Sequence, residues 1–152
     1  MTEGDLAVCA RIIREGDAVD PESAVAELPQ SSAVAVARTS GDIVAVGAIK
    51  RIRPDYASRI ALRGKADFSP GTPELGYVAV DKKHRGKHLS SRIVAELLKM
   101  NHGPLFATTD DERMKRTLAN AGFERTMTGT VREAPYPCGS EAETLLNATK
   151  PV

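Results

Sequence analysis

Six basic or titratable side chains occupy seven consecutive positions just before an amphipathic helical pattern. They are Lys82, Lys83, His84, Arg85, Lys87 and His88. The start of a helix disfavours cations, because the helix dipole and the free backbone N–H groups already place partial positive charge there. Such a cluster at that end predicts a site for a strongly anionic group such as a pyrophosphate. A solvated loop with no ligand is the alternative interpretation.

Small and hydroxylic residues beside the cations suit the same chemistry. Gly86 lets the backbone approach a ligand closely, and Ser90 and Ser91 offer hydroxyl groups in the first helical turn. Neither the P-loop pattern GxxxxGKS/T nor the dinucleotide pattern GxGxxG occurs in the sequence. We expect no metal site at the chain's three histidines, because the neighbouring Lys and Arg side chains would repel a cation.

Length and composition favour one domain spanning residues 1–152. Of the 152 residues, 41% are hydrophobic and 27% are charged, and the formal net charge is +1. This near-neutral charge argues against nucleic acid as a partner. No apolar run reaches the roughly 20 residues of a membrane helix, and the acidic beginning of the chain lacks the apolar core of a signal peptide. We therefore expect a cytoplasmic protein.

The elements before the turn follow from local patterns. Apolar residues recur at helical spacing over 6–13, and Gly16 is placed to end that helix. Asp20 as N-cap and Pro21 at the first helical position predict a short second helix. Two alternating, β-branched runs within 32–50, separated by TSGD, predict a β-hairpin.

The turn itself lies between a strand and a helix. Residues 51–73 are rich in Pro and Gly, and they predict a long connection with a short strand near 60–62 at most. Residues 74–80 are apolar on both faces, which predicts a strand at the centre of its sheet. Helical spacing of apolar residues then runs from Leu89 to Met100.

Beyond this helix the pattern continues with strand, helix and strand. Residues 104–109 predict a strand, and Thr109 with Glu112 fits a capping box for the next helix. Gly122 is placed to stop that helix, and residues 123–131 alternate as a final strand.

The segment 74–98 resembles the acyl-CoA-binding core of the GNAT acetyltransferase superfamily. In that family a central strand is followed by a turn of the form Q/R-x-x-G-x-G/A, and here the turn is KHRGKH, residues 83–88. The later LFATTDDERMKRTLANAGFE resembles the family's next strand and helix, which end in GF, here Gly122 and Phe123. In element order the resemblance covers about residues 3–130. It implies an α/β (α+β) fold with a central mixed, mostly antiparallel sheet and helices on both faces.

The resemblance implies transfer of an acetyl group from acetyl-CoA to a primary amine of a small molecule or protein by direct attack. The backbone N–H of Val78 would polarise the thioester, and Val80 would pair with the pantetheine arm. The other cofactor-binding residues would be Lys83, Arg85, Gly86, Lys87, His88, Leu89, Ser90 and Ser91. Two of them depart from the family pattern: Lys83 replaces Gln or Arg, and His88 replaces a small residue.

Glu74 stands at the family position of a glutamate general base. Strand alternation would place it on one face with Gly76, Val78 and Val80, opposite Tyr77, which we expect in the core. The alternative is an exposed glutamate at the entry of a strand.

The general acid is less clearly marked. The family's usual tyrosine, four residues before the glycine of GF, is replaced by Leu118, which cannot donate a proton. Tyr136 is the first candidate for this role and Cys138 the second. The thiolate could also leave without an acid.

Four carboxylates, Glu15, Asp17, Asp20 and Glu22, lie in the connection between the first two helices. Relatives in the family commonly bind the acceptor nearby, so these carboxylates would attract a cationic amine, although helix capping explains them as well. Two other functions stay open. One is an acyl-CoA-binding module without turnover, and the other is a nucleic-acid-directed protein that uses the basic stretch 50–65. The resemblance is also compatible with a homodimer.

Overall fold

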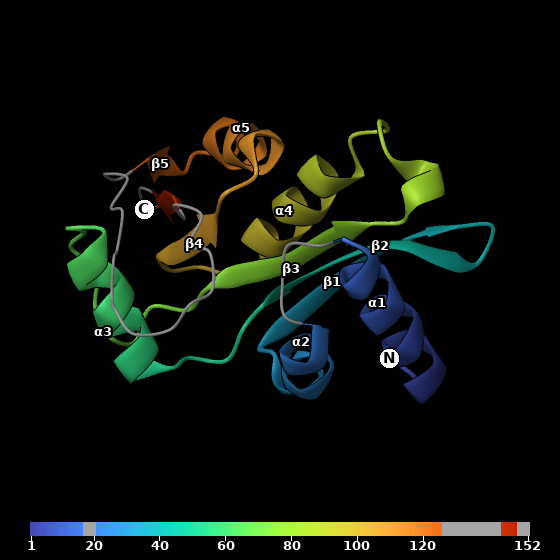
Figure 1. Cartoon of the computed structure of the whole chain (residues 1–152), viewed down its shortest axis with the longest axis horizontal. Helices are drawn as coiled ribbons and strands as arrows, with labels where there is room; N and C mark the ends of the chain where they lie inside the picture. The colour runs from blue at the N-terminus through green and yellow to red at the C-terminus, as the bar shows by residue number, and fades with distance from the viewer. Residues whose placement is uncertain (17–20, 126–143, 149–152) are drawn as a thin grey trace, which may run out of the picture. The chain divides into compact units, whose positions relative to one another are not determined.

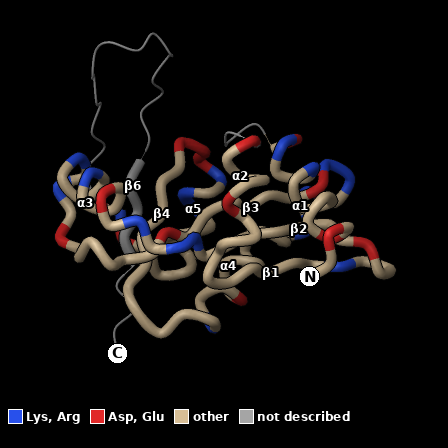
Figure 2. The backbone as a smooth tube through the Cα atoms, turned by 90° about the horizontal axis from the view of Figure 1, so that it is seen from below, with Lys and Arg blue, Asp and Glu red and all other residues tan. Residues whose placement is uncertain are grey.

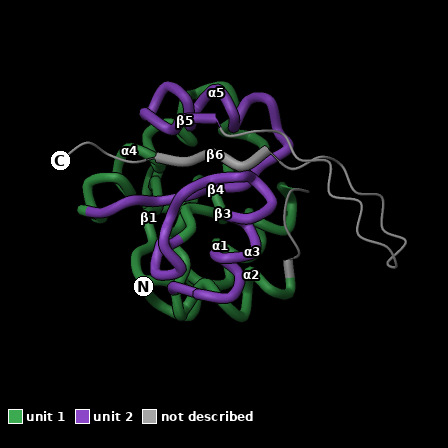
Figure 3. Tube along the Cα trace, turned by 90° about the vertical axis from the view of Figure 1, so that its left-hand side faces the viewer, with its two compact units in different colours: residues 1–51, 74–102 green, residues 52–73, 103–152 purple. Residues whose placement is uncertain are grey.

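A computed structural model of the chain describes residues 1–16, 21–125 and 144–148. It divides into two compact units, which are coloured in Figure 3. The first comprises Met1–Arg51 and Glu74–His102, and the second comprises Ile52–Pro73 and Gly103–Val152. Within the described residues, no helix has the length and apolar character needed to span a bilayer.

The first unit contains a three-stranded antiparallel sheet. Its strands are β1 (Ala33–Thr39), β2 (Asp42–Ile49) and β3 (Leu75–Val80), in the order β1-β2-β3. The predicted hairpin is confirmed as β1 and β2. Ser40 and Gly41 between them have φ of 51° and 87°. Two successive positive φ angles give a turn whose twist matches that of the paired strands.

Helices cover both faces of this sheet, as the family resemblance implied (Figure 1). The helices α1 (Glu3–Glu15) and α2 (Pro21–Glu27) lie on one face, and α4 (Leu89–Met100) lies on the other. Thr2 begins α1 with a reciprocal capping box, and Gly16 ends it as predicted.

The face toward α1 and α2 carries an apolar core. A short 3-10 helix, η1 (Leu28–Gln30), follows α2 and adds Leu28 to it. The buried members are Cys9, Ile12, Ile13, Ala24, Leu28, Ile43, Val46, Ala48 and Tyr77. Burial is also the main cause that raises the pKa of the Cys9 thiol, so this cysteine packs as a small apolar side chain.

The opposite face is packed closely because Gly47 has no side chain. A Cβ at Gly47 would clash with Cγ2 of Ile93 on α4, and it would lie 3.1 Å from Cδ1 of Leu97. It would also lie 3.2 Å from Cγ2 of Val78 on β3. Glycine at this position therefore lets α4 approach the backbone of β2.

The sequence predicted that β3 is central in its sheet, and this is wrong. Among the described strands, β3 pairs with β2 alone and lies at the edge of its sheet. Its two faces are nevertheless covered, one by α1 and the other by α4. Apolar residues on both faces of a strand indicate that both faces are buried, but they do not require a neighbouring strand at each edge. Here α1 and α4 bury the two faces of β3.

In the residues that the structure describes, the second unit contains a second antiparallel sheet, in the order β4-β6-β5, and two helices. Its elements are α3 (Pro54–Arg63), β4 (Leu105–Thr109), α5 (Glu112–Asn120), β5 (Glu124–Arg125) and β6 (Thr144–Ala148). Of the predicted strand 123–131, only β5 falls within the described residues.

The helix α3 corrects the prediction of a loop, or at most a short strand, in this segment. Pro54 stands at its start, Asp55 lies in its first turn and Gly64 caps its end. Ala57 and Ile60 are buried in a cluster that also contains the β4 residue Phe106. The Pro and Gly residues that indicated a loop therefore mark the two ends of a ten-residue helix.

Basic residues lie along α3 and beside its ends, where the backbone tube is blue in Figure 2. Arg53 and Arg59 place their guanidinium carbons 4.5 and 5.8 Å from the ring centre of Tyr56. Part of the basic stretch 50–65 thus makes cation–π contacts on a helix, whereas the sequence predicted a long connection there.

The start of α5 also differs from the prediction. The N-cap is Asp111, whose carboxylate accepts a hydrogen bond from the N–H of Arg113 at 2.8 Å. Thr109 instead accepts from the N–H of Asp111 at 3.2 Å, one step before the helix. Asp111, two residues closer to the helix than Thr109, therefore caps α5 in place of the predicted capping box. At the other end Gly122 has φ of 100°, and it follows the helix as predicted.

Replacing Gly47 with Ala should lower the free energy of unfolding by about 1 to 3 kcal/mol, because the added methyl group must displace Ile93. Gly4→Ala is the matched control. Gly4 lies in the first turn of α1, and the nearest atom to an added Cβ is Thr2 Oγ1 at 3.7 Å, so a methyl group fits there. Alanine also has a higher helix propensity than glycine, so this control should not lower the stability. Urea unfolding followed by circular dichroism measures both. Equal stability of Gly47→Ala and wild type would contradict the close packing of α4 on β2.

Candidate active site

The strand β3 leads into α4 through a turn with an unusual backbone. Lys82–His84 form a 3-10 turn, η2, and Gly86 and His88 then have φ of 79° and 57°. Glycine adopts positive φ without steric penalty, whereas His88 does so against its preference. An added Cβ at Gly86 would meet no atom within 4 Å. The turn thus needs glycine for its backbone angles and leaves space beside it.

His88 is the N-cap of α4, but its side chain makes no capping hydrogen bond. That side chain therefore accepts no hydrogen bond from the first N–H groups of the helix. A bound anion could accept from these N–H groups instead. Leu89 is buried and anchors the start of the helix, while Ser90 is half-buried and Ser91 exposed. The predicted phosphate-binding residues lie together at this helix start.

The cations of the turn face solvent. Lys82, Lys83, Arg85 and Lys87 are exposed, and within the described part of the chain none of them pairs with a carboxylate. Four such cations beside the positive end of a helix repel one another. An anion bound at the turn would reduce this repulsion.

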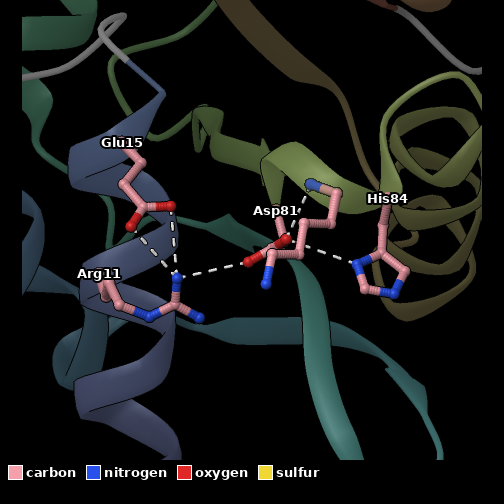
Figure 4. Close-up of polar contacts among 5 residues, drawn as sticks. Arg11, Glu15, Asp81 and His84 are labelled. Atoms are coloured by element: carbon pink, nitrogen blue, oxygen red, sulfur yellow. Dashed lines mark hydrogen bonds and ion pairs between the residues drawn. The ribbon is translucent and has the colours of Figure 1, made fainter.

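Asp81, which sequence reasoning missed, anchors the turn (Figure 4). Its carboxylate accepts a hydrogen bond from the N–H of Lys83 at 3.0 Å and lies 3.4 Å from Nδ1 of His84. Arg11 of α1 donates to it at 3.3 Å and also contacts Glu15. The pKa of Asp81 is lowered, mainly by the Lys83 N–H and further by His84 and Arg11. The turn is thereby tied to α1.

A β-bulge lies in β3, where the thioester-polarising N–H was predicted. The pairing between β2 and β3 shifts between Val46 and Ala48, so that Tyr77 and Val78 both oppose Gly47. Tyr77 has φ of 55°. A bulge interrupts the ladder and increases the local twist of the strand.

The bulge corrects the predicted faces of β3. Tyr77 belongs to the core that faces α1 and α2, whereas Val78 packs beside Gly47 on the face toward α4. Glu74 and Tyr77 both contact the side chain of Lys50, so they share a face. The prediction that Glu74 lies with Val78 and opposite Tyr77 is therefore wrong, because one inserted residue reverses the alternation. The core position of Tyr77 is confirmed.

Glu74 immediately precedes β3 and is only 5% exposed, so the alternative of an exposed strand-entry glutamate is wrong. Its Oε2 lies 3.1 Å from Nζ of Lys50. The same ammonium lies 4.4 Å from the ring centre of Tyr77, whose hydroxyl donates to Oε2 of Glu27 at 2.9 Å. Sequence reasoning missed Lys50 and Glu27, because the contacts depend on strand pairing and helix packing.

Several predicted residues fall outside the described part of the structure. They are Tyr136, Cys138, Asp17 and Asp20. Leu118, at the usual general-acid position, is buried in the second unit. Across residues 1–16, 21–125 and 144–148, no three His, Cys, Asp or Glu side chains gather as metal ligands.

Solved structures of acetyltransferases resemble this chain in fold. The ribosomal-protein-alanine N-acetyltransferase of Brucella melitensis has a TM-score of 0.69 and 20% identity, covering 99% of this chain and 97% of that one. A phosphinothricin acetyltransferase of Sinorhizobium meliloti in complex with acetyl-CoA has a TM-score of 0.69 and 15% identity, covering 98% and 85%. The diaminobutyrate acetyltransferase of Paenibacillus lautus has a TM-score of 0.67 and 19% identity, covering 96% and 89%.

A comparison with curated protein sequences found no significant match. The family model of the acetyltransferase (GNAT) family, however, matches residues 7–123, more than half of the chain. This match runs through both units and confirms the family, fold class and enzyme class predicted from the sequence. The chain therefore belongs to the acetyltransferase (GNAT) family.

Proposed function

We propose that the protein transfers an acetyl group from acetyl-CoA to a primary amine of a small molecule or protein. The observation that carries the proposal is the exposed cationic turn at the uncapped start of α4. Family membership supplies the reaction class. Acetyl-CoA is present in the similar Sinorhizobium structure, and coenzyme A with L-2,4-diaminobutyric acid in the similar Paenibacillus structure.

The turn residues would hold the cofactor. Backbone N–H groups from Gly86 to Ser90 would receive the pyrophosphate, and the side chains of Lys83, Arg85 and Lys87 would supply positive charge. Val80 would pair with the pantetheine arm through its backbone. The N–H of Val78, at the bulge, would polarise the thioester carbonyl.

Glu74 would act as general base. Its carboxylate would accept a proton from the acceptor's ammonium, and the neutral amine would then attack the thioester carbonyl directly. The C–N bond forms, the C–S bond breaks, and the coenzyme leaves as a thiolate. Tyr136 remains the first candidate for protonating this thiolate, and Cys138 the second.

A cationic amine is the acceptor class that this chain suits. The first unit carries three further carboxylates in addition to Glu74. Glu15 is the last residue of α1, Glu22 lies in the first turn of α2, and Glu27 is the last residue of α2. These carboxylates would attract a cation. Loss of turnover with retained acyl-CoA binding is the second candidate function, favoured by His88 and by the buried Leu118.

The double variant Arg85→Glu, Gly86→Glu should raise the Kd for acetyl-CoA about 100-fold or more, because it places two carboxylates at the phosphate site. Isothermal titration calorimetry measures this. The control is Lys99→Glu, Met100→Glu, which makes the same change in net charge at two exposed positions of the last turn of α4. Equal affinity of the two variants for acetyl-CoA would contradict the cofactor site.

Glu74→Gln should lower kcat by about 10²- to 10⁴-fold while leaving the Kd for acetyl-CoA almost unchanged. Glutamine keeps the size of the side chain and can still accept from Lys50, but it cannot take the proton. Thiol release with a panel of polyamines, amino acids and lysine peptides measures turnover. Undiminished kcat in the variant would remove Glu74 from the mechanism. Binding of acetyl-CoA without turnover of any amine would favour the second candidate function.

Asp81→Asn should weaken acetyl-CoA binding about 10-fold and leave kcat nearly unchanged, because the turn loses its charged anchor. Asparagine can still accept from the Lys83 N–H but no longer attracts Arg11 or His84. Glu15→Gln is the control, since it removes the other carboxylate partner of Arg11 without touching the turn.

The pH dependence of stability gives a second readout on the same variant. A lowered pKa in the folded state means that the charge of Asp81 stabilises the fold above the pKa of an unfolded aspartate, about 3.9. That contribution is lost as the pH falls through the folded value. The stability difference between wild type and Asp81→Asn should therefore shrink below about pH 3.9. A difference independent of pH would contradict the charged anchor.

A further inference from the structure

Lys50 directly follows β2 and extends its side chain across the neighbouring strand. Its backbone N–H donates to the carbonyl oxygen of Glu74 at 2.8 Å, which sets the two residues opposite each other. Its side chain occupies the space beside Gly76, where an added Cβ would lie 2.7 Å from Cε of Lys50. The missing side chain at Gly76 thus makes room for a lysine that runs along β3.

The ammonium of Lys50 ends in surroundings that suit an amine ligand. A carboxylate oxygen of Glu74 lies 3.1 Å away, the ring centre of Tyr77 lies 4.4 Å away, and the lysine side chain is only 13% exposed. A carboxylate together with an aromatic face is a common binding arrangement for an ammonium group. The chain thereby places its own primary amine against the carboxylate that would deprotonate an acceptor.

The direction of the side chain is also informative. Tyr77, over whose ring the ammonium lies, directly precedes Val78 at the bulge. In the proposed function the N–H of Val78 polarises the thioester carbonyl. The amine of Lys50 therefore lies beside the strand that carries both the proposed base and the backbone N–H proposed to polarise the thioester.

We propose that Lys50 is an acetyl acceptor of this same site, so that the protein acetylates its own lysine from bound acetyl-CoA; this inference rests on the proposed function. Glu74 takes one proton from the ammonium, and the neutral amine attacks the thioester carbonyl. The C–N bond forms, the C–S bond breaks, and the nitrogen loses a second proton. One proton leaves on the coenzyme thiol, and the other passes through Glu74 to solvent. The product is a neutral amide, which ends the ion pair between Lys50 and Glu74.

The test is incubation of the wild-type protein with acetyl-CoA and no other acceptor. Digestion with a protease that does not cleave at lysine, followed by mass spectrometry, locates the added acetyl group. Lys50 should gain one acetyl group at a rate independent of protein concentration, as an intramolecular reaction requires. The exposed Lys99 serves as an internal measure of uncatalysed acetylation in the same digest.

Two variants complete the test. Glu74→Gln should slow acetylation of Lys50 about 100-fold or more, and Arg85→Glu, Gly86→Glu should reduce it to the rate at Lys99. Acetylation of Lys50 no faster than Lys99, or equally fast in Glu74→Gln, would overturn the inference. An unmodified Lys50 in a protein that binds acetyl-CoA and acetylates a free amine would overturn it while leaving the proposed function intact. Failure to bind acetyl-CoA would remove both.

Discussion

The bulge in β3 is the constraint on which the arrangement of the site depends. One extra residue places Tyr77 and Val78 opposite Gly47, and it brings Tyr77 onto the face that carries Glu74. Without it, strict alternation would point the aromatic ring toward α4 and leave Lys50 without that ring beneath its ammonium. The same irregularity interrupts the strand ladder at the residue whose N–H is proposed to act on the thioester. A single inserted residue thus interrupts the backbone ladder at Val78 and also brings the ring of Tyr77 beside Lys50.

The turn after β3 is shaped by repulsion among its cations. Its cations are exposed and lie beside the positive end of α4, so their mutual repulsion opposes an ordered loop. Asp81 places a negative charge beside these cations. Its carboxylate accepts a hydrogen bond from the backbone of η2 and forms an ion pair with Arg11 of α1. The loop can therefore stay ordered before a ligand arrives, which reduces the entropy lost on binding.

Local signals predicted much of the fold, and tertiary contacts account for the errors. Capping residues and periodicity located α1, the hairpin, β3 and α4, because those signals act within a few residues. The helix α3 was missed since its Pro and Gly were interpreted as loop residues, although they stand at its ends. Face assignments along β3 failed because the bulge arises from pairing with β2. The partners Lys50 and Arg11 lie 24 and 70 residues from Glu74 and Asp81, beyond the reach of any local pattern.

The ion pair between Lys50 and Glu74 also shapes what an acceptor must offer. On the proposed function, an incoming ammonium competes for a carboxylate that already has a cation 3.1 Å away. Exchange of one cation for another at a single carboxylate yields little net free energy, so contact with Glu74 alone cannot select the substrate. Discrimination must come from contacts elsewhere on the acceptor. Acetylation of Lys50 would change this balance, because it removes the competing charge and leaves Glu74 to the acceptor.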